Sequence, residues 1–556
     1  MRNVVATTSG LLVSFLLTAC GGGDTSDTPG TGTGGTTAHP AGGSGGTAGK
    51  GVGASGGTGG GAMTGGTGGG VSAGGSGGAS PTGGSGAGAG RANATGGAGM
   101  GMGMGGAMTG GSGGQPGSGG ALPMAGASNP GGGAGSGGSA GAGPTTTCTI
   151  TPTATASTAI PTVQTVTFTT DATGITKAEI EFGAAGSTMT APVDLTDPTY
   201  KTYLVGMKPS TAYTYRIKIT SPAGTCVSAD QMFTTGALAN APKPTVTIMD
   251  MAKHDKGFIV MSSGIGGTAA YIIDPDGTVV WVAPSSVVPG QPSRAHLSWD
   301  AKRFIVMSLN VQNSSAGKIQ SVAMDGTDMK SISGTTASHH DFTAIPGGIA
   351  TLLWNKSGID APCSLVEFPD SGMQKTIVAD FSTIYNSSSF HTNAIHYYER
   401  DDSYTIGDRN PNLYAKLTRA GALVWQFGGM NPKDAAKNFS GVTTWSVNHG
   451  HHLTADNQFA FFNNGSGSSS TAFIYKLDPT TMKATQTAKI TGTNSMVLGD
   501  AQILPNGNVL VSGSTTGTMA EVEPMSGAII MTIKAPSGQQ FGYSEFRESL
   551  YGAPPY

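Results

Sequence analysis

Histidine and amide side chains gather in three short stretches of the chain. The stretches are His339-His340-Asp341, His391-Thr392-Asn393 and Asn448-His449. An imidazole can act as a nucleophile, a proton carrier or a metal ligand near neutral pH. Each stretch comes just ahead of an apolar run with the alternation of a β-strand. Three clusters at matching places in three repeats predict one shared site.

The strands that position these stretches belong to a repeated unit in residues 245–556. An apolar strand recurs roughly every 45 to 55 residues, the spacing of four-stranded propeller blades. These first strands of the units are predicted at 257–261, 303–307, 348–353, 403–406, 458–462 and 508–511. Each is followed by a second strand ending near a turn, and several units show a third strand. Amphipathic helical spacing is almost absent, so the sequence predicts an all-β fold whose main domain is a six-bladed β-propeller.

A smaller module precedes the propeller at residues 146–237. Its runs 163–170 and 177–182 alternate strongly, and its segment Pro-Ser-Thr-Ala-Tyr-Thr-Tyr at 209–215 resembles a late strand of fibronectin type III domains. Short strands with frequent turns predict a small β-sandwich. Cys148 and Cys226 lie near its two ends, and in an exported chain we expect them to form a disulfide. No acid, base or nucleophile constellation occurs here.

The first residues have the pattern of an export signal. Arg2 precedes a short apolar run at 11–17, and Leu17-Thr18-Ala19-Cys20 resembles a bacterial lipobox. The run is too short to span a bilayer. Residues 1–20 are therefore expected to be a lipoprotein signal peptide, with Cys20 the lipidated residue; the alternative is an ordinary secretory signal. We expect an exported protein, anchored by lipid to the outer membrane or the periplasmic face of the envelope.

Residues 21–145 consist mainly of Gly, Ser, Thr and Ala, and no aromatic residue occurs between Phe15 and Phe168. Such a segment cannot bury enough apolar surface to offset the entropy of ordering. It is predicted to be a long disordered, Gly-rich tether.

The composition also excludes some functions. The net charge of −3 and the lack of a basic patch argue against a nucleic-acid partner. The glycine runs lie in the tether and do not form a phosphate-binding loop between a strand and a helix. No cofactor is expected.

Several motifs in the carboxyl-terminal half share an order and register with one known family. They are His339-His340-Asp341-Phe342, His391-Thr392-Asn393-Ala394, Gly407-Asp408-Arg409-Asn410, Leu423-Val424-Trp425-Gln426-Phe427-Gly428-Gly429, Asn448-His449 with Phe462-Asn463-Asn464-Gly465, and Leu504-Pro505-Asn506-Gly507-Asn508. Together they resemble the bacterial arylsulfotransferases, which are six-bladed propellers with an amino-terminal β-sandwich. The resemblance covers both the sandwich and the propeller.

The resemblance implies an enzyme and assigns its residues. The family carries a sulfuryl group on a histidine, and motif position makes that residue His449. His340, His391, Asn393 and Arg409 resemble its supporting set. The implied reaction is ping-pong: a phenolic sulfate ester gives its sulfuryl group to His449, and an acceptor phenol then takes it. The implied partners are small phenols and their sulfates, without a nucleotide donor.

The chemistry of sulfuryl transfer explains these residue types. By analogy with phosphoryl transfer, catalysis is mostly positioning and charge stabilisation. Arg409 and an N–H of Asn393 would hold the sulfuryl oxygens, and His391 or His340 would serve the phenolic oxygen. Trp354 and Trp445 could line an aryl pocket or fill blades. One departure concerns Asn463-Asn464-Gly465, where the family normally has Asp-Asn-Gly.

Other interpretations remain open. His340, Asp341, His391 and His449 could bind Zn²⁺, although no HExxH motif supports a metal site. Asp341 is more readily interpreted as an acceptor that orients a histidine, and His451 as a solvated residue. A different class of function is a propeller lipoprotein of the cell envelope that binds a ligand without turnover. The sequence leaves the oligomeric state open.

Overall fold

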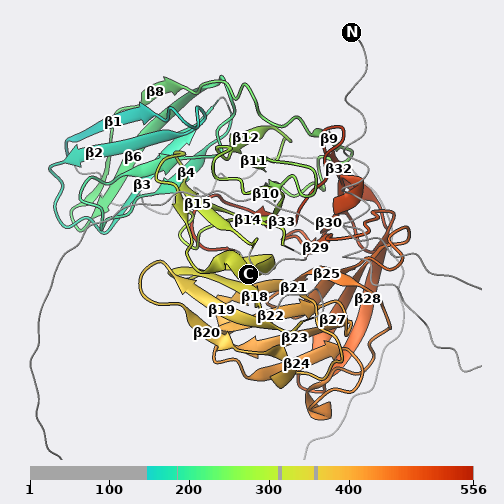
Figure 1. Ribbon diagram of the computed structural model, residues 1–556. Coiled ribbons are helices and arrows are strands. Elements are labelled where there is room, and N and C mark those ends of the chain that lie inside the picture. Colours follow the sequence, from blue (N-terminus) through green and yellow to red (C-terminus); the bar gives the residue numbers. More distant parts are fainter. Residues whose placement is uncertain (1–146, 185, 311–315, 356–360, 555–556) are drawn as a thin grey trace, which may run out of the picture. The chain divides into compact units, whose positions relative to one another are not determined.

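The computed structural model describes residues 147–184, 186–310, 316–355 and 361–554 (Figure 1). The predicted signal peptide with Cys20 and the predicted tether lie outside these ranges. Every regular element in the described ranges is a β-strand or a short 3₁₀ turn. None of the helical segments in these ranges has the length and apolar character needed to cross a bilayer. The all-β prediction is confirmed.

The amino-terminal domain is a sandwich of two antiparallel sheets. One sheet has the order β1 (Ile150–Ala156), β2 (Gln164–Thr170), β5 (Thr202–Leu204). The other contains β4 (Met189–Pro192), β3 (Lys177–Gly183), β6 (Ala212–Ser221), β7 (Gly224–Val227) and β8 (Gln231–Thr234). Alternate residues of β3 and β6 are buried, as expected when one face of each sheet covers a shared core. A disulfide joins Cys148, ahead of β1, to Cys226 in β7.

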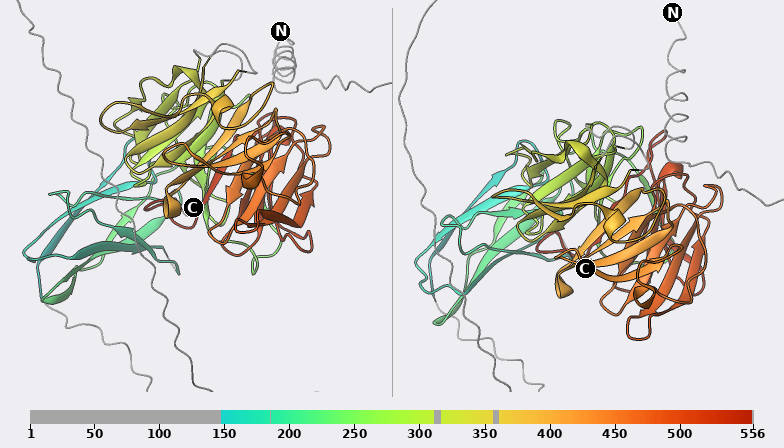
Figure 2. Two further views of the ribbon diagram at one scale, coloured as in Figure 1. Left: turned by 90° about the horizontal axis from the view of Figure 1, so that it is seen from below. Right: turned by 60° about the horizontal axis from the view of Figure 1, so that its bottom comes forward.

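The remaining strands form six antiparallel sheets, the blades of the propeller (Figures 1 and 2). Blades 2 and 3 are β13 (Pro292–Leu297), β14 (Arg303–Ser308), β15 (Ile319–Ala323), β16 (Lys330–Ser331), and β17 (Ser338–Ile345), β18 (Gly348–Trp354), β19 (Cys363–Pro369), β20 (Lys375–Val378). Blades 4 and 5 are β21 (Thr392–Tyr398), β22 (Ser403–Asp408), β23 (Leu413–Thr418), β24 (Leu423–Gly428), and β25 (Asn448–Leu453), β26 (Gln458–Asn463), β27 (Thr471–Asp478), β28 (Lys483–Thr491).

Strands from both ends of the domain complete blades 1 and 6. Blade 1 is β33 (Ser544–Arg547), β10 (Phe258–Ser262), β11 (Ala270–Ile273) and β12 (Val279–Val282). Blade 6 is β29 (Asp500–Ile503), β30 (Val509–Gly513), β31 (Thr518–Val522), β32 (Ile529–Lys534) and β9 (Thr245–Ile248). The carboxyl-terminal β33 is thus the inner strand of blade 1, and β9 is the outer strand of blade 6. Strands from the two ends of the domain thus close the ring, and the blades leave only short inner edges.

The innermost strands carry polar residues, which corrects the predicted strand order. The apolar strands expected to come first in each unit are the second strands, β10, β14, β18, β22, β26 and β30. The first strands pack against their neighbours around the ring, for example β17 against β21 and β25 against β29. All eight residues of β17 and all six of β25 are buried. His339, His340 and His449 therefore lie within inner strands, and His391 immediately precedes one.

Apolar side chains fill the space within and between the blades. Trp281 is fully buried and stacks on Phe304 with ring centroids 4.3 Å apart. Trp425 lies in an aromatic core with Phe427, Phe439 and Phe459. These rigid cores hold the inner strands, and with them the polar residues on the axis.

Candidate active site

His449 lies near the start of β25 and is fully buried. Its Nδ1 atom lies 2.6 Å from Oδ1 of Asn464. The Asn464 amide nitrogen donates to the carbonyls of Ser495 and Leu498, at 2.9 and 2.8 Å, so its oxygen must be the acceptor. The proton of His449 is therefore on Nδ1, and Nε2 holds the lone pair. Among the described residues Nε2 has no hydrogen-bond partner.

Burial keeps His449 neutral. It lowers the pKa of His449 to about 3, and the positive charge of Arg409 acts in the same direction; the hydrogen bond to Asn464 opposes both. A neutral imidazole with a free Nε2 lone pair is the form that a nucleophilic histidine requires.

Two further histidines share this space. The ring centroid of His340 lies 6.1 Å from that of His449 and 5.0 Å from that of His391. Neither nitrogen of His340 has a hydrogen-bond partner in the described residues. Burial lowers the pKa of His340 well below its usual value, and a proton on His340 would also be disfavoured by the nearby His339, His449 and Arg409. The inner strands of blades 3, 4 and 5 thus bring His340, His391 and His449 together.

Left-handed backbone conformations occur beside the site. His340 has φ of 58° at an irregularity in the pairing of β17 with β18, and Val447 has φ of 59° just before β25. A β-branched residue such as valine rarely adopts this conformation. The Val447 N–H donates to Asn412 Oδ1 at 2.8 Å, which helps to hold it. Strain of this kind gathers where the surrounding fold dictates the direction of functional side chains.

Arg409 and Asn393 complete the predicted set. The Nη2 atom of Arg409 lies 3.5 Å from Nδ1 of His391. Asp408 holds the same loop, since its carboxylate accepts from the His391 backbone N–H at 2.8 Å and from the Tyr385 hydroxyl at 2.7 Å. Asn393 donates from its amide nitrogen to the Asn448 carbonyl at 2.8 Å. That bond links blades 4 and 5 and uses one of the two N–H groups expected to hold a sulfuryl oxygen.

Asp341 does not orient a histidine, contrary to the expectation from sequence. Its carboxylate pairs with Arg294 of β13 at 2.7 and 3.1 Å and accepts from the Ile395 N–H at 3.0 Å. Arg294 also contacts Asp500 at 3.3 Å, and it is fully buried. The sequence did not predict a role for Arg294, because its partners Asp341 and Asp500 lie in blades 3 and 6.

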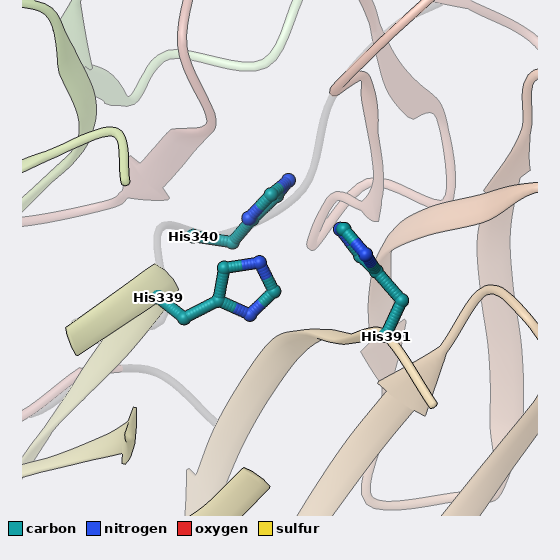
Figure 3. Close-up of side chains that lie close together, drawn as sticks. All are labelled: His339, His340 and His391. Carbon is teal, nitrogen blue, oxygen red and sulfur yellow. The ribbon is translucent and has the colours of Figure 1, made fainter. Parts of the chain in front are cut away.

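His339 is a buried residue of the first predicted stretch that received no role from the sequence. Its ring lies over Trp354, with centroids 3.7 Å apart, and 4.1 and 4.7 Å from the rings of His340 and His391. In Figure 3 the rings of His339, His340 and His391 face a common space. The only signal in the sequence was its place beside His340.

The two histidines after His449 have separate partners. His451 is fully buried, which corrects the expectation that it is solvated, and its Nε2 lies 2.6 Å from the Thr405 hydroxyl. His452 accepts from the Ile503 N–H at 3.1 Å. Both belong to the packing between blades.

A cleft of about 860 Å³ adjoins the loops of blades 4 and 5. Its lining includes Phe390 and Asn410, the chain neighbours of His391 and Arg409, and also Trp445. The indole N–H of Trp445 donates to Asn448 Oδ1 at 3.1 Å. Trp445 therefore connects the cleft to the strand that carries His449, whereas Trp354 lies against the histidines themselves.

Residues 367–536 match the family described as arylsulfotransferase (ASST). This part of the chain is similar to the arylsulfotransferase family. The matched segment contains His391, Asn393, Arg409, His449 and Asn464, and it supports a sulfotransferase type of function with phenolic substrates in general. His340 precedes it.

Other comparisons give only distant likenesses. A search among curated proteins gave no match. A putative 6-phosphogluconolactonase from Bacteroides fragilis is 12% identical with a TM-score of 0.36, over 54% of this chain and 100% of that chain. TolB from Acinetobacter baumannii is also 12% identical with a TM-score of 0.36, over 62% and 80%. Apo AztD from Citrobacter koseri is 10% identical with a TM-score of 0.27, over 66% and 98%.

The departure from the usual arylsulfotransferase motif has a structural explanation. Asn463 stands where the family normally has aspartate, and its Oδ1 accepts from the N–H groups of Ser446 and Gly465, at 3.1 and 3.3 Å. An amide oxygen does this as a carboxylate would. Asn464, which the motif retains, is the residue that contacts His449. Gly450, next to His449, has no room for a side chain, because a Cβ atom there would lie 2.1 Å from an Asp500 carboxylate oxygen.

Proposed function

We propose that this protein is an aryl sulfotransferase that moves a sulfuryl group from a phenolic sulfate ester to an acceptor phenol through a sulfohistidine at His449. No nucleotide donor takes part. The observation that supports this proposal is the bond between His449 Nδ1 and Asn464 Oδ1, which leaves a buried Nε2 lone pair beside Arg409 and two more histidines.

In the first half-reaction the Nε2 lone pair of His449 attacks the sulfur of the donor. The N–S bond forms as the bond from sulfur to the phenolic oxygen breaks, and the bonding pair leaves on that oxygen. His449 keeps its Nδ1 proton, which Asn464 accepts throughout. The fixed acceptor offsets the positive charge that develops on the ring, as an orienting acceptor does for other catalytic histidines.

The leaving oxygen needs a hydrogen-bond donor. A guanidinium only donates, so the contact from Arg409 to Nδ1 of His391 favours the tautomer with the proton on Nε2 of His391. We assign His391 as the donor to the phenolic oxygen and Arg409 as the cation that stabilises the sulfuryl oxygens. The second N–H of Asn393 can add one bond to these oxygens.

In the second half-reaction an acceptor phenol attacks the sulfur of the sulfohistidine. The new O–S bond forms, the N–S bond breaks and its electron pair returns to Nε2. The acceptor's proton moves to His340, both of whose nitrogens lack a partner in the described residues. His340 then releases that proton to solvent, where the phenolate from the first half-reaction takes one up, so that the net reaction exchanges a sulfuryl group for a proton between two phenols.

We also propose that the enzyme works outside the cytoplasm on a lipid anchor at Cys20. The lipobox-like Leu17-Thr18-Ala19-Cys20 supports this location. Metabolic labelling with a fatty acid should mark the wild-type chain and not Cys20→Ala.

The enzymatic proposal is tested with 4-nitrophenyl sulfate. Mixed with excess enzyme and no acceptor, the donor should release one nitrophenolate per active chain, and mass spectrometry should find one SO₃ group on the peptide containing His449. His449→Ala should abolish both signals, while His452→Gln should retain them. No release by the wild type, or release by His449→Ala at the wild-type rate, contradicts the proposal.

A further inference from the structure

His339, His340 and His391 form a compact cluster of imidazoles in the described part of the chain. One nitrogen of each ring lies within 4.8 Å of the other two, and all three residues are fully buried (Figure 3). We propose that this cluster binds a divalent transition-metal ion of the zinc type. A second part, which rests on the proposed function, is that the bound ion blocks sulfuryl transfer.

His339 is oriented as a metal ligand would be. Its Nδ1 atom lies 2.9 Å from the Thr392 carbonyl oxygen, which can only accept, so the proton is on Nδ1. The lone pair is then on Nε2, which has no hydrogen-bond partner among the described residues. A histidine whose second nitrogen donates to a backbone carbonyl is the usual arrangement in metal sites.

The other two ligands come from neighbouring inner strands. Either nitrogen of His340 can bind an ion, since neither has a partner in the described ranges. His391 contacts Arg409 through Nδ1, so an ion must replace that contact or the proton on Nε2. The three residues sit on blades 3 and 4, whose rigid cores limit how far the rings can separate.

The ligand types favour one class of metal. Three neutral nitrogen ligands with an open fourth position suit Zn²⁺ or Co²⁺, whereas Mg²⁺ and Ca²⁺ require oxygen ligands. The nearby carboxylates are already engaged, Asp341 with Arg294 and Asp408 with Tyr385 and the His391 backbone. Cys363 Sγ lies 3.8 Å from His339, but on the Nδ1 side, so the thiol is not part of the proposed ligand set.

Arg409 should affect metal binding and sulfuryl transfer in opposite directions, which allows the two to be measured apart. Its positive charge repels a dication and attracts a sulfuryl group. Replacing Arg409 by glutamine should therefore tighten metal binding while it slows sulfuryl transfer. A residue with a merely structural role would not move the two measurements in opposite directions.

An ion at this site would act as an inhibitor. It occupies nitrogens of His340 and His391 that are proposed to serve the two phenolic oxygens. Zn²⁺ should compete with the aryl sulfate donor.

The test uses the full chain with Co²⁺ and Zn²⁺ alone. Equilibrium dialysis without substrate should find one tightly bound ion, with a visible Co²⁺ spectrum of tetrahedral type. His339→Gln and, separately, His340→Gln should weaken binding by about 10- to 100-fold. Cys363→Ser and His39→Ala should bind as the wild type does, which controls for the thiol and for a histidine outside the described residues. Circular dichroism confirms that each variant is folded.

The outcomes separate the two proposals. No tight ion in the wild type, or equal binding by the wild type and both glutamine variants, overturns the metal site even if sulfuryl transfer is normal. Tight binding in a protein without transferase activity upholds the metal site and contradicts the proposed function. In an active enzyme, Zn²⁺ should raise the apparent KM for the donor, and His339→Gln should lose this effect; inhibition equal in both forms contradicts the inhibitory role.

Discussion

His449 Nδ1 and Asn464 Oδ1 are 2.6 Å apart and join the start of β25 to the residue after β26. The interaction selects the tautomer of His449, because the two carbonyls bound by the Asn464 amide fix which of its atoms faces the ring. The proposed nucleophile therefore depends on the residue after a neighbouring strand for its tautomer.

Asn464→Ala should lower kcat for sulfuryl transfer by about 10²-fold, since the ring loses both its tautomer and its position. KM for 4-nitrophenyl sulfate should change much less. The matched control is Asn463→Asp, which keeps an oxygen acceptor for Ser446 and Gly465 and should stay close to the wild type. Equal losses in the two variants would show that general disturbance of the turn, and not the contact with His449, sets the rate.

The pH profile of kcat/KM should lack a limb near pH 6.5. His449 acts when neutral, and its folded-state pKa of about 3 lies below the ordinary histidine value, so the reactive form persists as the pH falls from 7.5 to 5. Arg409→Gln removes a charge that lowers this pKa and should move the acid limb to higher pH. It should also reduce kcat by about 10²- to 10³-fold. Product is measured after an alkaline quench; an acid limb near 6.5 in the wild type contradicts the prediction.

Arg294→Met should lower the free energy of unfolding by about 3–5 kcal/mol, because it leaves the carboxylates of Asp341 and Asp500 buried without their cation. Denaturant titration measures the change. The double variant Arg294→Met/Asp341→Leu should recover part of the loss, since one of the two unpaired carboxylates is gone. A single variant as stable as the wild type would mean that the network contributes little.

Acidification should destabilise the folded protein. Burial holds the pKa values of His340 and His451 well below the ordinary value, and that of His452 at about 4. As the pH falls below about 6.5, these histidines therefore bind protons in the unfolded chain but not in the folded chain. The free energy of unfolding is thus highest above that pH and decreases as the pH falls toward 4. Each such histidine contributes up to about 1.4 kcal/mol per pH unit. Unfolding free energies that are equal at about pH 7.5 and 5 would contradict this account.

Loss of the disulfide should affect stability and not catalysis. The bond spans 78 residues and joins Cys148, ahead of β1, to β7, both in the sandwich, which contains none of the proposed site residues. Cys148→Ala/Cys226→Ala should reduce the unfolding free energy of the sandwich by about 2–4 kcal/mol. Turnover of 4-nitrophenyl sulfate at 25 °C should be unchanged; a matching loss of activity would show that the sandwich supports the site.

The sequence predicted the fold where apolar alternation was strong. The runs at 257–261, 303–307 and 458–462 correspond to β10, β14 and β26, and their recurrence identified six blades. The inner strands were not predicted as strands because their residues are polar, and a search for apolar alternation assigns polar runs to turns. Within the His-His-Asp sequence of β17, Arg294 from blade 2 pairs with Asp341 and the Thr392 carbonyl from blade 4 accepts from His339, contacts that the sequence does not reveal.

The site could be predicted because its motifs occur at matching positions in the repeated units of the propeller. His340, His391, Asn393, Arg409 and His449 are together in the structure, although their four separate stretches of chain would give no such indication without the repeat. His339 and Arg294 could not be assigned from sequence, because their roles depend on contacts between blades. Asp341 was misassigned for the same reason: its partner is an arginine in the preceding blade.

The position of β33 sets the order in which a newly made chain can become active. Blade 1 lacks its inner strand until residues 544–547 have been synthesised, and Tyr543 and Ser544 contact Asn393 and Arg294 from there. In a partly translated chain the proposed site therefore stays incomplete, even if the other blades have already folded. Under the proposed function, topology alone would prevent premature chemistry during synthesis.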